Sequence, residues 1–282
     1  PGPEVIPMVA NIAHRGARSL APENTIAAAA KAFEAGADLW ETDVSVTRDE
    51  VLILFHDRFL TRTTDVDRVF PGRTSDLVVD YLFGEIQMLD TGLPYIAADP
   101  FQEIQQKNVS RSDLDRYRGE KVPSLEQALV YTKENQWSVN LELKEQPGRF
   151  KDFPLFRRVL DMVDYVGIDP GQVIISSFNH AWLDQVKTIA PWMPIQALIG
   201  KNRFKPMEWK DFSFSAYNAN SRLVDEAQIR RAKKRGKTVN LFTVNDTAEM
   251  IRFIDAGVDG IITDYPQRLA LLLQDPSVCR RS

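Results

Sequence analysis

Residues 38–57, with the sequence DLWETDVSVTRDEVLILFHD, decide the fold. Two strand-like runs, 44–47 and 51–55, are separated by only three residues, Arg-Asp-Glu. A parallel connection needs a crossover of a dozen or more residues, so the two runs must pair as an antiparallel hairpin. The stretch therefore supplies one barrel-type strand and one extra strand that folds back on it.

The turn of this hairpin sets which side chains face each other. If it falls at residues 48 and 49, His56 lies opposite Glu41, and Leu54 lies opposite Asp43. Local pairing then brings a histidine and a carboxylate together, although about fifteen residues separate them in the sequence.

Outside the extra strand, short apolar runs predict strands, and apolar residues with a 3.6-residue period predict helices. The predicted strands are 9–14, 38–43, 137–143, 172–177, 194–199, 212–217, 238–243 and 259–263. The predicted helices are 24–35, 124–135, 152–164, 180–189, 224–235, 246–255 and 266–274. Eight strands alternating with helices predict an α/β fold, a (β/α)8 TIM barrel with an extra β-hairpin after strand 2. We expect residues 1–282 to form a single TIM-barrel catalytic domain.

Residues 57–121 fit no strand–helix unit of the barrel. A structureless loop of this length is unusual, so we expect an inserted small subdomain with short elements of its own. Two interpretations are open: a solvated excursion without a catalytic role, or a lid that shapes the substrate site.

Composition narrows the classes of partner. The net charge of −4 gives no basic footprint, so we expect no nucleic-acid partner. No run of 18 apolar residues occurs, so we expect no transmembrane segment. The single cysteine, Cys279, favours a reducing compartment such as the cytoplasm. A periplasmic or secreted protein is the other option, since a leader could precede the Pro-Gly-Pro start. No sequence feature indicates an oligomeric state.

Three carboxylates indicate a metal site. Glu41 and Asp43 alternate with Thr42 and so share one strand face, directed into the barrel. Glu142 lies in the run VNLELKE, among apolar residues that need outward positions. Carboxylates on one face repel each other unless a cation lies between them. Hard oxygen ligands suit Mg²⁺ or Ca²⁺, and we expect one such divalent cation as cofactor.

Two of the three histidines and two cations border these carboxylates. His14 and His56 each end an apolar run, and a histidine pair can act as general acid and base. Arg15 and Lys144 would neutralise an anionic phosphate. The combination is a phosphodiester-cleaving arrangement.

At these residues the chain resembles the glycerophosphodiester phosphodiesterase family, within the barrel group that includes phosphatidylinositol-specific phospholipases C. The resemblance runs from residue 13 to residue 266. Its matching stretches are AHRGARSLAPENT, WETDVSVTRDEVLILFHD, LTRTT, VPSLEQAL, VNLELK, VIISSF, LFTVND and GVDGIITDYP.

The resemblance implies a fold, a reaction and a set of roles. The small-molecule substrate is a glycerophosphodiester, cleaved to sn-glycerol 3-phosphate and an alcohol by water or through a cyclic phosphate. It implies His14 and His56 as general acid and base, and Arg15 and Lys144 as phosphate ligands. It also implies one divalent cation on the three carboxylates, Glu41, Asp43 and Glu142. Where many members have a tryptophan, this chain has Phe242, which retains an aromatic wall for the substrate pocket.

An alternative function keeps the site and changes the substrate. A lysophospholipase D would need an apolar channel for an acyl chain, with candidate residues Phe70, Leu77, Tyr81, Leu82 and Phe83 in the insertion. The other interpretation of these residues is a small core of the insertion itself. A non-catalytic binding barrel is disfavoured, because no expected ligand or histidine is missing.

Overall fold

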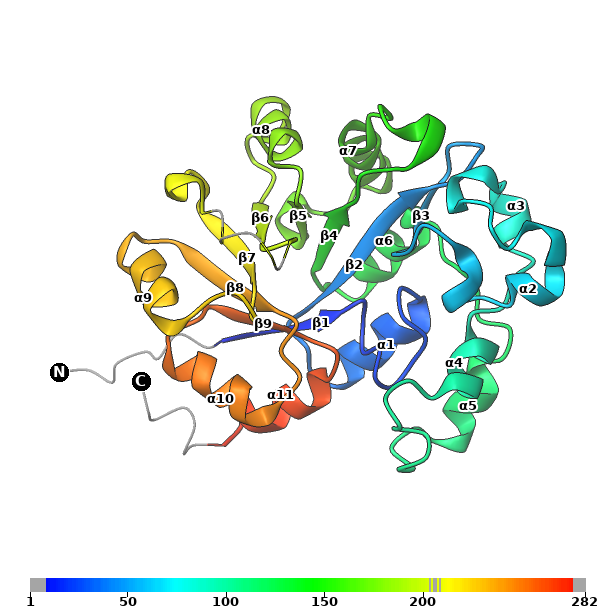
Figure 1. Cartoon of the computed structure of the whole chain (residues 1–282), viewed down its shortest axis with the longest axis horizontal. Helices are drawn as coiled ribbons and strands as arrows, with labels where there is room; N and C mark the ends of the chain where they lie inside the picture. Colours follow the sequence, from blue (N-terminus) through cyan, green and yellow to red (C-terminus); the bar gives the residue numbers. More distant parts are fainter. Residues whose placement is uncertain (1–8, 203, 205–206, 208, 276–282) are drawn as a thin grey trace.

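The strands of the chain close into a barrel with one strand outside it (Figure 1). The computed structural model describes residues 9–202, 204, 207 and 209–275. Its sheet has the order β1-β9-β8-β7-β6-β5-β4-β2-β3, and β1 also pairs with β2 to close the ring. The strands are β1 (Ala10–His14), β2 (Leu39–Val46), β3 (Leu52–Leu54), β4 (Val139–Leu143), β5 (Val173–Ser177), β6 (Ile195–Ile199), β7 (Ala216–Asn220), β8 (Thr238–Phe242) and β9 (Gly260–Thr263). Among these strands of the described residues, β2–β3 is the one antiparallel pair, which confirms the predicted TIM barrel with its extra hairpin.

Helices surround this barrel and return the chain between parallel strands (Figure 1). They are α1 (Ile26–Glu34), α6 (Leu125–Glu134), α7 (Leu155–Val166), α8 (His180–Ile189), α9 (Glu226–Lys234), α10 (Thr247–Asp255) and α11 (Pro266–Leu273). Their starts follow capping chemistry: Thr25 accepts the Ala28 N–H and begins α1, and Ser124 accepts the Gln127 N–H and begins α6. No helix in the described ranges is long and apolar enough to cross a membrane.

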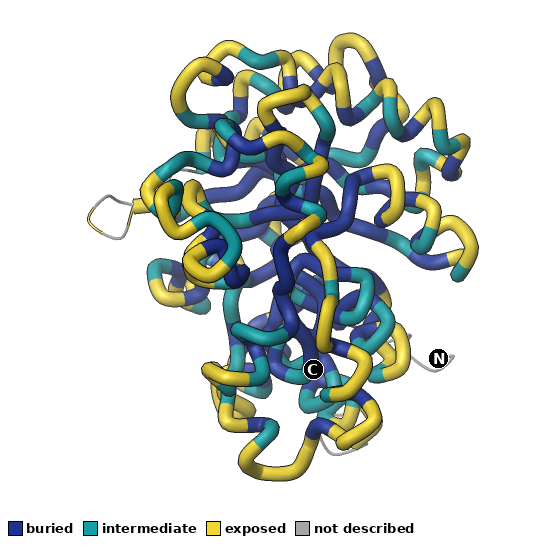
Figure 2. Tube along the Cα trace, turned by 90° about the vertical axis from the view of Figure 1, so that its right-hand side faces the viewer, coloured by how far each residue is buried: buried dark blue, intermediate teal, exposed yellow. Residues whose placement is uncertain are grey.

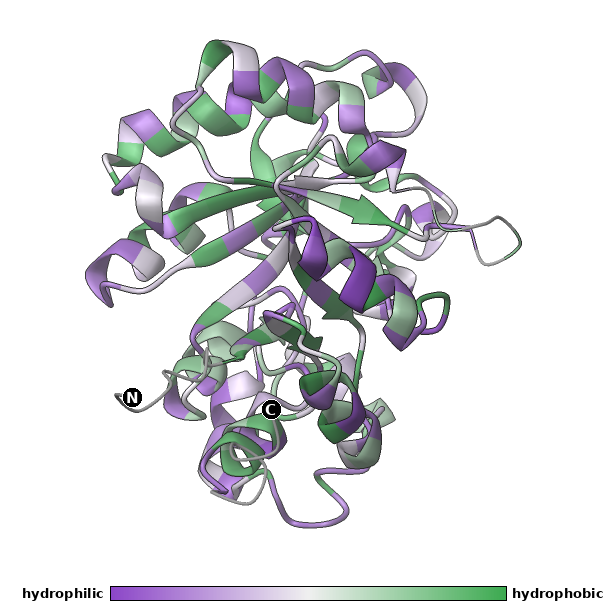
Figure 3. Ribbon diagram, turned by 90° about the vertical axis from the view of Figure 1, so that its left-hand side faces the viewer, coloured by the Kyte–Doolittle hydropathy of each residue, from purple (hydrophilic) through white to green (hydrophobic). Residues whose placement is uncertain are grey.

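Buried residues concentrate on the central strands, and the outer helix faces are exposed and hydrophilic (Figures 2 and 3). Ile12, Leu39 and Ile262 pack together inside the barrel. Because side chains alternate along a strand, the residues two positions further along also point inward. In β1 and β2 these are His14 and Glu41. The barrel interior therefore changes from apolar to polar toward the carboxyl ends of the strands, where TIM barrels place their sites.

The predicted register of the β2–β3 hairpin was wrong by one residue. Val44 pairs with Leu54 and Val46 with Leu52, so His56 does not lie opposite Glu41, and Leu54 does not lie opposite Asp43. The reason is a three-residue turn at 48–50, where Glu50 adopts a positive φ of 63° and the Thr47 N–H donates to the Val51 carbonyl.

The predicted strand at residues 212–217 was also displaced. Phe212 and Phe214 made residues 212–217 look like a buried strand, but the run 210–212 forms a single 3-10 turn, and β7 begins at Ala216. Both phenylalanines are buried in the hydrophobic core outside the barrel. Inside the strand the inward position is Asn218, a polar residue that apolar patterning does not select. The link before this strand includes residues 203, 205–206 and 208, which lie outside the described residues.

The segment from Asp57 to Lys121 carries short helices, at the right of Figure 1, whose buried residues extend the core of the barrel. These are α2 (Val66–Val69), α3 (Phe83–Ile86), α4 (Gly92–Ala98) and α5 (Arg111–Tyr117), with 3-10 turns η1 (Leu60–Arg62), η2 (Pro71–Arg73) and η3 (Val78–Asp80). Tyr81 is fully buried, and Phe70, Leu77 and Phe83 pack against the same core, while Leu82 is exposed. Four of the five residues considered for an acyl channel thus pack in the hydrophobic core that the insertion shares with the barrel.

Candidate active site

Three carboxylates meet inside the carboxyl end of the barrel. Asp43 pairs in register with Glu142 across β2 and β4, and Glu41 lies two residues before Asp43 on the same face. One ligand oxygen from each of the three lies within 4.8 Å of the others. Glu41 and Asp43 are buried, and Glu142 is partly buried. The structure therefore brings together the three residues that the sequence singled out as metal ligands.

The charges in this cluster are not balanced by the protein alone. Burial, together with the charges of Asp43 and Glu142, raises the pKa of Glu41 well above its usual value. Burial also raises the pKa of Glu142, and the Asp43 charge acts in the same direction. Asp43 differs: although burial opposes ionisation, Lys144 and Arg15 hold its pKa below the usual range. A set of hard, converging oxygen donors with unfavourable mutual repulsion fits a bound divalent cation.

Arg15 occupies a strained turn at the end of β1. It has a positive φ of 55°, and its backbone N–H donates to Glu41 Oε2 at 3.0 Å. The next residue must be glycine, because a Cβ on Gly16 would lie 2.5 Å from the carbonyl carbon of Ala28 in α1. The Arg15 guanidinium then lies with Nε 3.2 Å from Asp43 Oδ2. A positive-φ turn of this kind is a typical functional-site feature.

Lys144 is the second cation in contact with the carboxylates, beside Arg15. Its Nζ lies 3.4 Å from Asp43 Oδ1 and 3.4 Å from Glu142 Oε1. Although burial opposes it, the charges of these two carboxylates raise the pKa of Lys144 above its usual value. Lys144 is therefore a permanent cation at the carboxylate cluster, which Arg15 and Lys144 both border.

His14 is held by a carboxylate that the sequence analysis did not assign. Its Nδ1 lies 2.6 Å from Oδ1 of Asp264, the residue directly after β9. Despite burial, the hydrogen bonds from His14 and Asn245 and the charge of Arg18 help to hold the pKa of Asp264 at about 2, so Asp264 is ionised and accepts the Nδ1 proton. Burial and the Arg15 charge lower the pKa of His14 itself. His14 is thus neutral at pH 7, with Nε2 available as a base.

His56 has an equivalent partner next to it in the sequence. Its Nδ1 lies 2.6 Å from Asp57 Oδ1, and Asp57 Oδ2 accepts from Nε of Arg62 at 2.5 Å. Despite partial burial, these two hydrogen bonds hold the pKa of Asp57 at about 2. Each histidine is therefore oriented through Nδ1 by an ionised carboxylate, which leaves Nε2 for chemistry.

Phe242 lines a cavity beside the carboxylates. The cavity has a volume of about 380 Å³, and its lining includes His56, Glu142, Lys144, Phe178 and Phe242. The Phe178 and Phe242 rings meet edge to face with centroids 6.0 Å apart. Two rings thus form an aromatic wall in this cavity, Phe178 directly after β5 and Phe242 at the end of β8. The third histidine, His180, is buried, and its Nε2 lies 2.9 Å from the Leu198 carbonyl oxygen.

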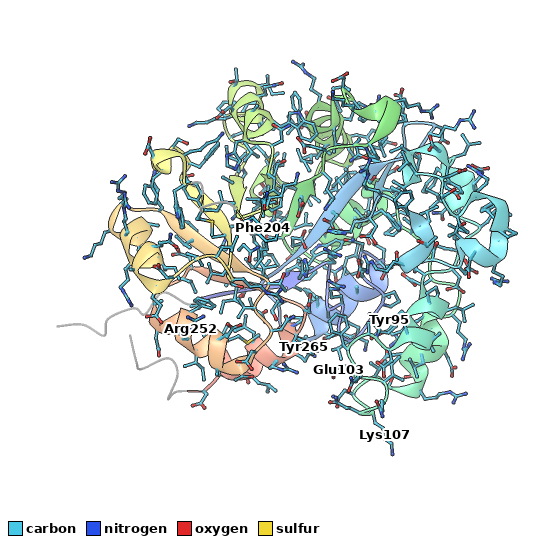
Figure 4. The ribbon with its side chains drawn as sticks, in the orientation of Figure 1. Tyr95, Glu103, Lys107, Phe204, Arg252 and Tyr265 are labelled. Carbon is cyan, nitrogen blue, oxygen red and sulfur yellow. The ribbon has the colours of Figure 1, made fainter. Side chains whose placement is uncertain are left out.

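The insertion reaches the loop that carries Asp264. Figure 4 shows Tyr95 and Glu103 of the insertion on the side of the barrel where Tyr265 lies. The Phe101 ring meets the Tyr265 ring edge to face at 5.6 Å, and the Tyr95 hydroxyl donates to the Ser19 carbonyl at 2.9 Å. The insertion therefore buttresses the loops that position His14.

Several polar residues around the site escaped the sequence analysis. Asn24 donates to Asp43 Oδ2 at 3.0 Å and accepts from the Thr42 hydroxyl at 2.7 Å, which fixes β2. Asp57 could have been found, because it directly follows His56. Asp264 could have been found as an acidic residue at the carboxyl end of the last barrel strand. Asn24 lies in a loop, and no local pattern marks its partners.

Comparisons with known proteins agree with this geometry. The model of the Glycerophosphoryl diester phosphodiesterase family matches residues 14–268. A glycerophosphodiester phosphodiesterase of Caldanaerobacter subterraneus subsp. tengcongensis is 31% identical over 269 residues, which cover 93% of this chain and 97% of that relative. A solved structure of a putative glycerophosphoryl diester phosphodiesterase from Silicibacter pomeroyi has a TM-score of 0.76 and 26% identity, and covers 95% of this chain and 94% of that chain.

A further solved structure shares the fold. It is an Oleispira antarctica phosphodiesterase in complex with the product sn-glycerol-3-phosphate, with a TM-score of 0.74 and 24% identity over 96% of this chain and 98% of that chain. The barrel and these comparisons define a phosphoric diester hydrolase. Within that class, the chain belongs to the glycerophosphoryl diester phosphodiesterase family. The resemblance stated from the sequence motifs is thereby confirmed.

Proposed function

We propose that this protein hydrolyses glycerophosphodiesters to sn-glycerol 3-phosphate and an alcohol in a reaction that depends on a divalent cation. The observation that carries the proposal is the carboxylate cluster bordered by Arg15 and Lys144, next to two histidines that are each fixed through Nδ1. The relative from Caldanaerobacter is a glycerophosphodiester phosphodiesterase by name, which supports the substrate class.

The metal ligands in this proposal are Glu41, Asp43 and Glu142, and the cation is Mg²⁺ or Ca²⁺. When bound, the cation would neutralise the repulsion among the carboxylates and act as a Lewis acid on a phosphoryl oxygen. Oxygen-only donors suit either ion.

Arg15 and Lys144 would bind the phosphate from two sides. Both are charged at pH 7, and each already lies against the carboxylates that they partly neutralise. A guanidinium can donate two parallel hydrogen bonds to phosphate oxygens, and an ammonium supplies a point charge. Negative charge that develops on phosphorus oxygens in the transition state is stabilised by these donors.

His14 and His56 would move the protons. His14 is neutral with Nε2 unprotonated, so it accepts a proton from the nucleophile, whether that is water or the glycerol hydroxyl of the substrate. His56, fixed by Asp57, donates a proton from Nε2 to the departing alkoxide. Phe242 and Phe178 would pack against the carbon skeleton of the substrate. A lysophospholipase D keeps the same chemistry, but the packing of Phe70, Leu77, Tyr81 and Phe83 supports a protein core instead of an acyl channel.

A substrate panel tests this proposal. We expect release of sn-glycerol 3-phosphate from glycerophosphocholine and glycerophosphoethanolamine, with much slower hydrolysis of lysophosphatidylcholine. His14→Ala and His56→Ala should each abolish the reaction, whereas Glu85→Gln, in the insertion, should not. Faster hydrolysis of lysophosphatidylcholine would overturn the substrate class in favour of a lysophospholipase D.

A further inference from the structure

Glu23 forms ion pairs with three arginines beside the active site. It lies in the loop between β1 and α1, and its side chain is only 9% exposed. Its Oε1 lies 2.8 Å from Arg15 and 2.6 Å from Arg62, and its Oε2 lies 2.7 Å from Arg18. A second Arg62 nitrogen donates to Oε2 at 2.8 Å, so the Arg62 pair is bidentate.

Two of these arginines also contact the aspartates that bind the two histidines. Arg62 comes from the insertion and donates to Asp57, which holds His56. Arg18 lies with NH1 3.6 Å from Oδ1 of Asp264, the oxygen that holds His14.

The third arginine, Arg15, contacts the carboxylate cluster, since its Nε lies 3.2 Å from Asp43 Oδ2. One buried carboxylate thus stands at the centre of a continuous set of ion pairs. The set joins both histidines and the carboxylate cluster.

The local sequence fixes Glu23 in this place. The next residue, Asn24, has a positive φ of 56° and binds β2, and Thr25 caps α1 and donates to the Pro22 carbonyl at 2.6 Å. Neighbours on both sides are therefore anchored, which leaves the Glu23 side chain little freedom. Three guanidinium groups would repel one another here without a carboxylate between them. Glu23 is firmly ionised: although burial opposes it, the Arg62 hydrogen bond and the Arg15 and Arg18 charges hold its pKa well below the usual range.

We propose that Glu23 is a positioning residue for hydrolysis, which acts on both histidines by holding Arg62 and Arg18. The inference rests on the proposed function. Without Glu23, Arg62 has Asp57 as its remaining carboxylate, and Arg18 has Asp264. Each arginine then loses its fixed position, so that Asp57 and Asp264 are no longer held in place against the imidazoles, and both histidines lose their alignment with the substrate.

Glu23→Gln tests this inference, because glutamine keeps the shape and removes the charge. We expect kcat to fall about 10- to 100-fold, since small misplacements of catalytic groups have effects of this size. KM should change far less than kcat. The matched control is Glu85→Gln, which removes a carboxylate that binds Arg73 at 2.7 Å in the insertion, away from the histidines. A folded Glu23→Gln protein with wild-type kcat, or with a loss confined to KM, would overturn the inference.

A second variant keeps the test independent of folding. Arg62 is 45% exposed, so Arg62→Gln should leave the melting temperature close to that of the wild type while lowering kcat. The double variant Glu23→Gln/Arg62→Gln should be no slower than Glu23→Gln alone, because both substitutions disrupt the same ion pair between Glu23 and Arg62. The inference would be contradicted if the loss of kcat in the double variant equalled the product of the two single losses, or if Arg62→Gln kept a wild-type kcat. A wild-type enzyme inactive on glycerophosphodiesters would instead overturn the proposed function, which separates the two failures.

Discussion

Replacement of Asp264 by asparagine should move the imidazole proton of His14 from Nδ1 to Nε2. Asp264 Oδ2 accepts from the Asn245 amide at 2.7 Å, and Oδ1 accepts from His14 at 2.6 Å. An asparagine at 264 keeps its oxygen toward Asn245 and turns its amide nitrogen toward His14. The imidazole must then accept at Nδ1 and carry its proton on Nε2, where the base is required. We expect kcat to fall by about 10²- to 10⁴-fold, the range for a lost general base or a wrong tautomer.

The same substitution should also lower stability by a calculable amount. The pKa of Asp264 is about 2 in the fold against an ordinary value of 3.8. A depressed carboxyl pKa contributes stability that is complete above about pH 4 and is lost as the pH falls through about 2. Nearly two pKa units correspond to about 2 kcal/mol at pH 7, or a decrease in Tm of roughly 4 °C.

Two measurements check the reasoning. Steady-state rates of sn-glycerol 3-phosphate release give kcat, and thermal unfolding at pH 7 and at pH 2 gives the stability difference. The stability difference should be present at pH 7 and should largely disappear at pH 2. If Asp264→Asn keeps kcat within tenfold of the wild type, the proposed orientation of His14 by Asp264 is refuted.

Three further predictions concern the carboxylates, the lysine and the second histidine. Raised carboxyl pKa values, as in Glu41 and Glu142, contribute stability below about pH 4.5 that is lost as the pH rises. Thermal unfolding of metal-free protein at pH 7 should therefore show that Glu142→Gln is more stable than the wild type. A less stable variant would contradict the repulsion among the three carboxylates. Lys144→Ala should lower kcat/KM roughly 10- to 100-fold from loss of a charged phosphate contact, and unchanged kcat/KM would exclude that contact. A glycerophosphodiester with a p-nitrophenol leaving group needs no general acid, so it should restore turnover in His56→Ala but not in His14→Ala; equal restoration would refute the assignment.

Much of the fold was predictable because local rules decide it. The three-residue link at 48–50 allows only an antiparallel hairpin, and alternating strands and helices leave few architectures. The register was not predictable, because it depends on Glu50 adopting a left-handed conformation in the turn. The displaced strand at β7 has a similar origin: Asn218 points inward where apolar patterning expects a hydrophobic residue.

The candidate site was predictable where chemistry and strand position coincide. Glu41, Asp43 and Glu142 stand out because charged residues at inward strand positions need a partner. Asp264 and Glu23 did not stand out, because each needs one partner from a distant part of the chain. The contact between Asp264 and His14 joins residues 250 positions apart, and the Glu23 cluster needs Arg62 from the insertion. Only closure of the barrel creates these pairs.

The most direct test of the catalytic cation is hydrolysis of glycerophosphocholine by wild-type protein after treatment with a chelator. We expect no release of sn-glycerol 3-phosphate until Mg²⁺ or Ca²⁺ is added, and no restoration by either ion in an Asp43→Asn variant. Hydrolysis that continues at the untreated rate after chelation would contradict a catalytic cation held by Glu41, Asp43 and Glu142.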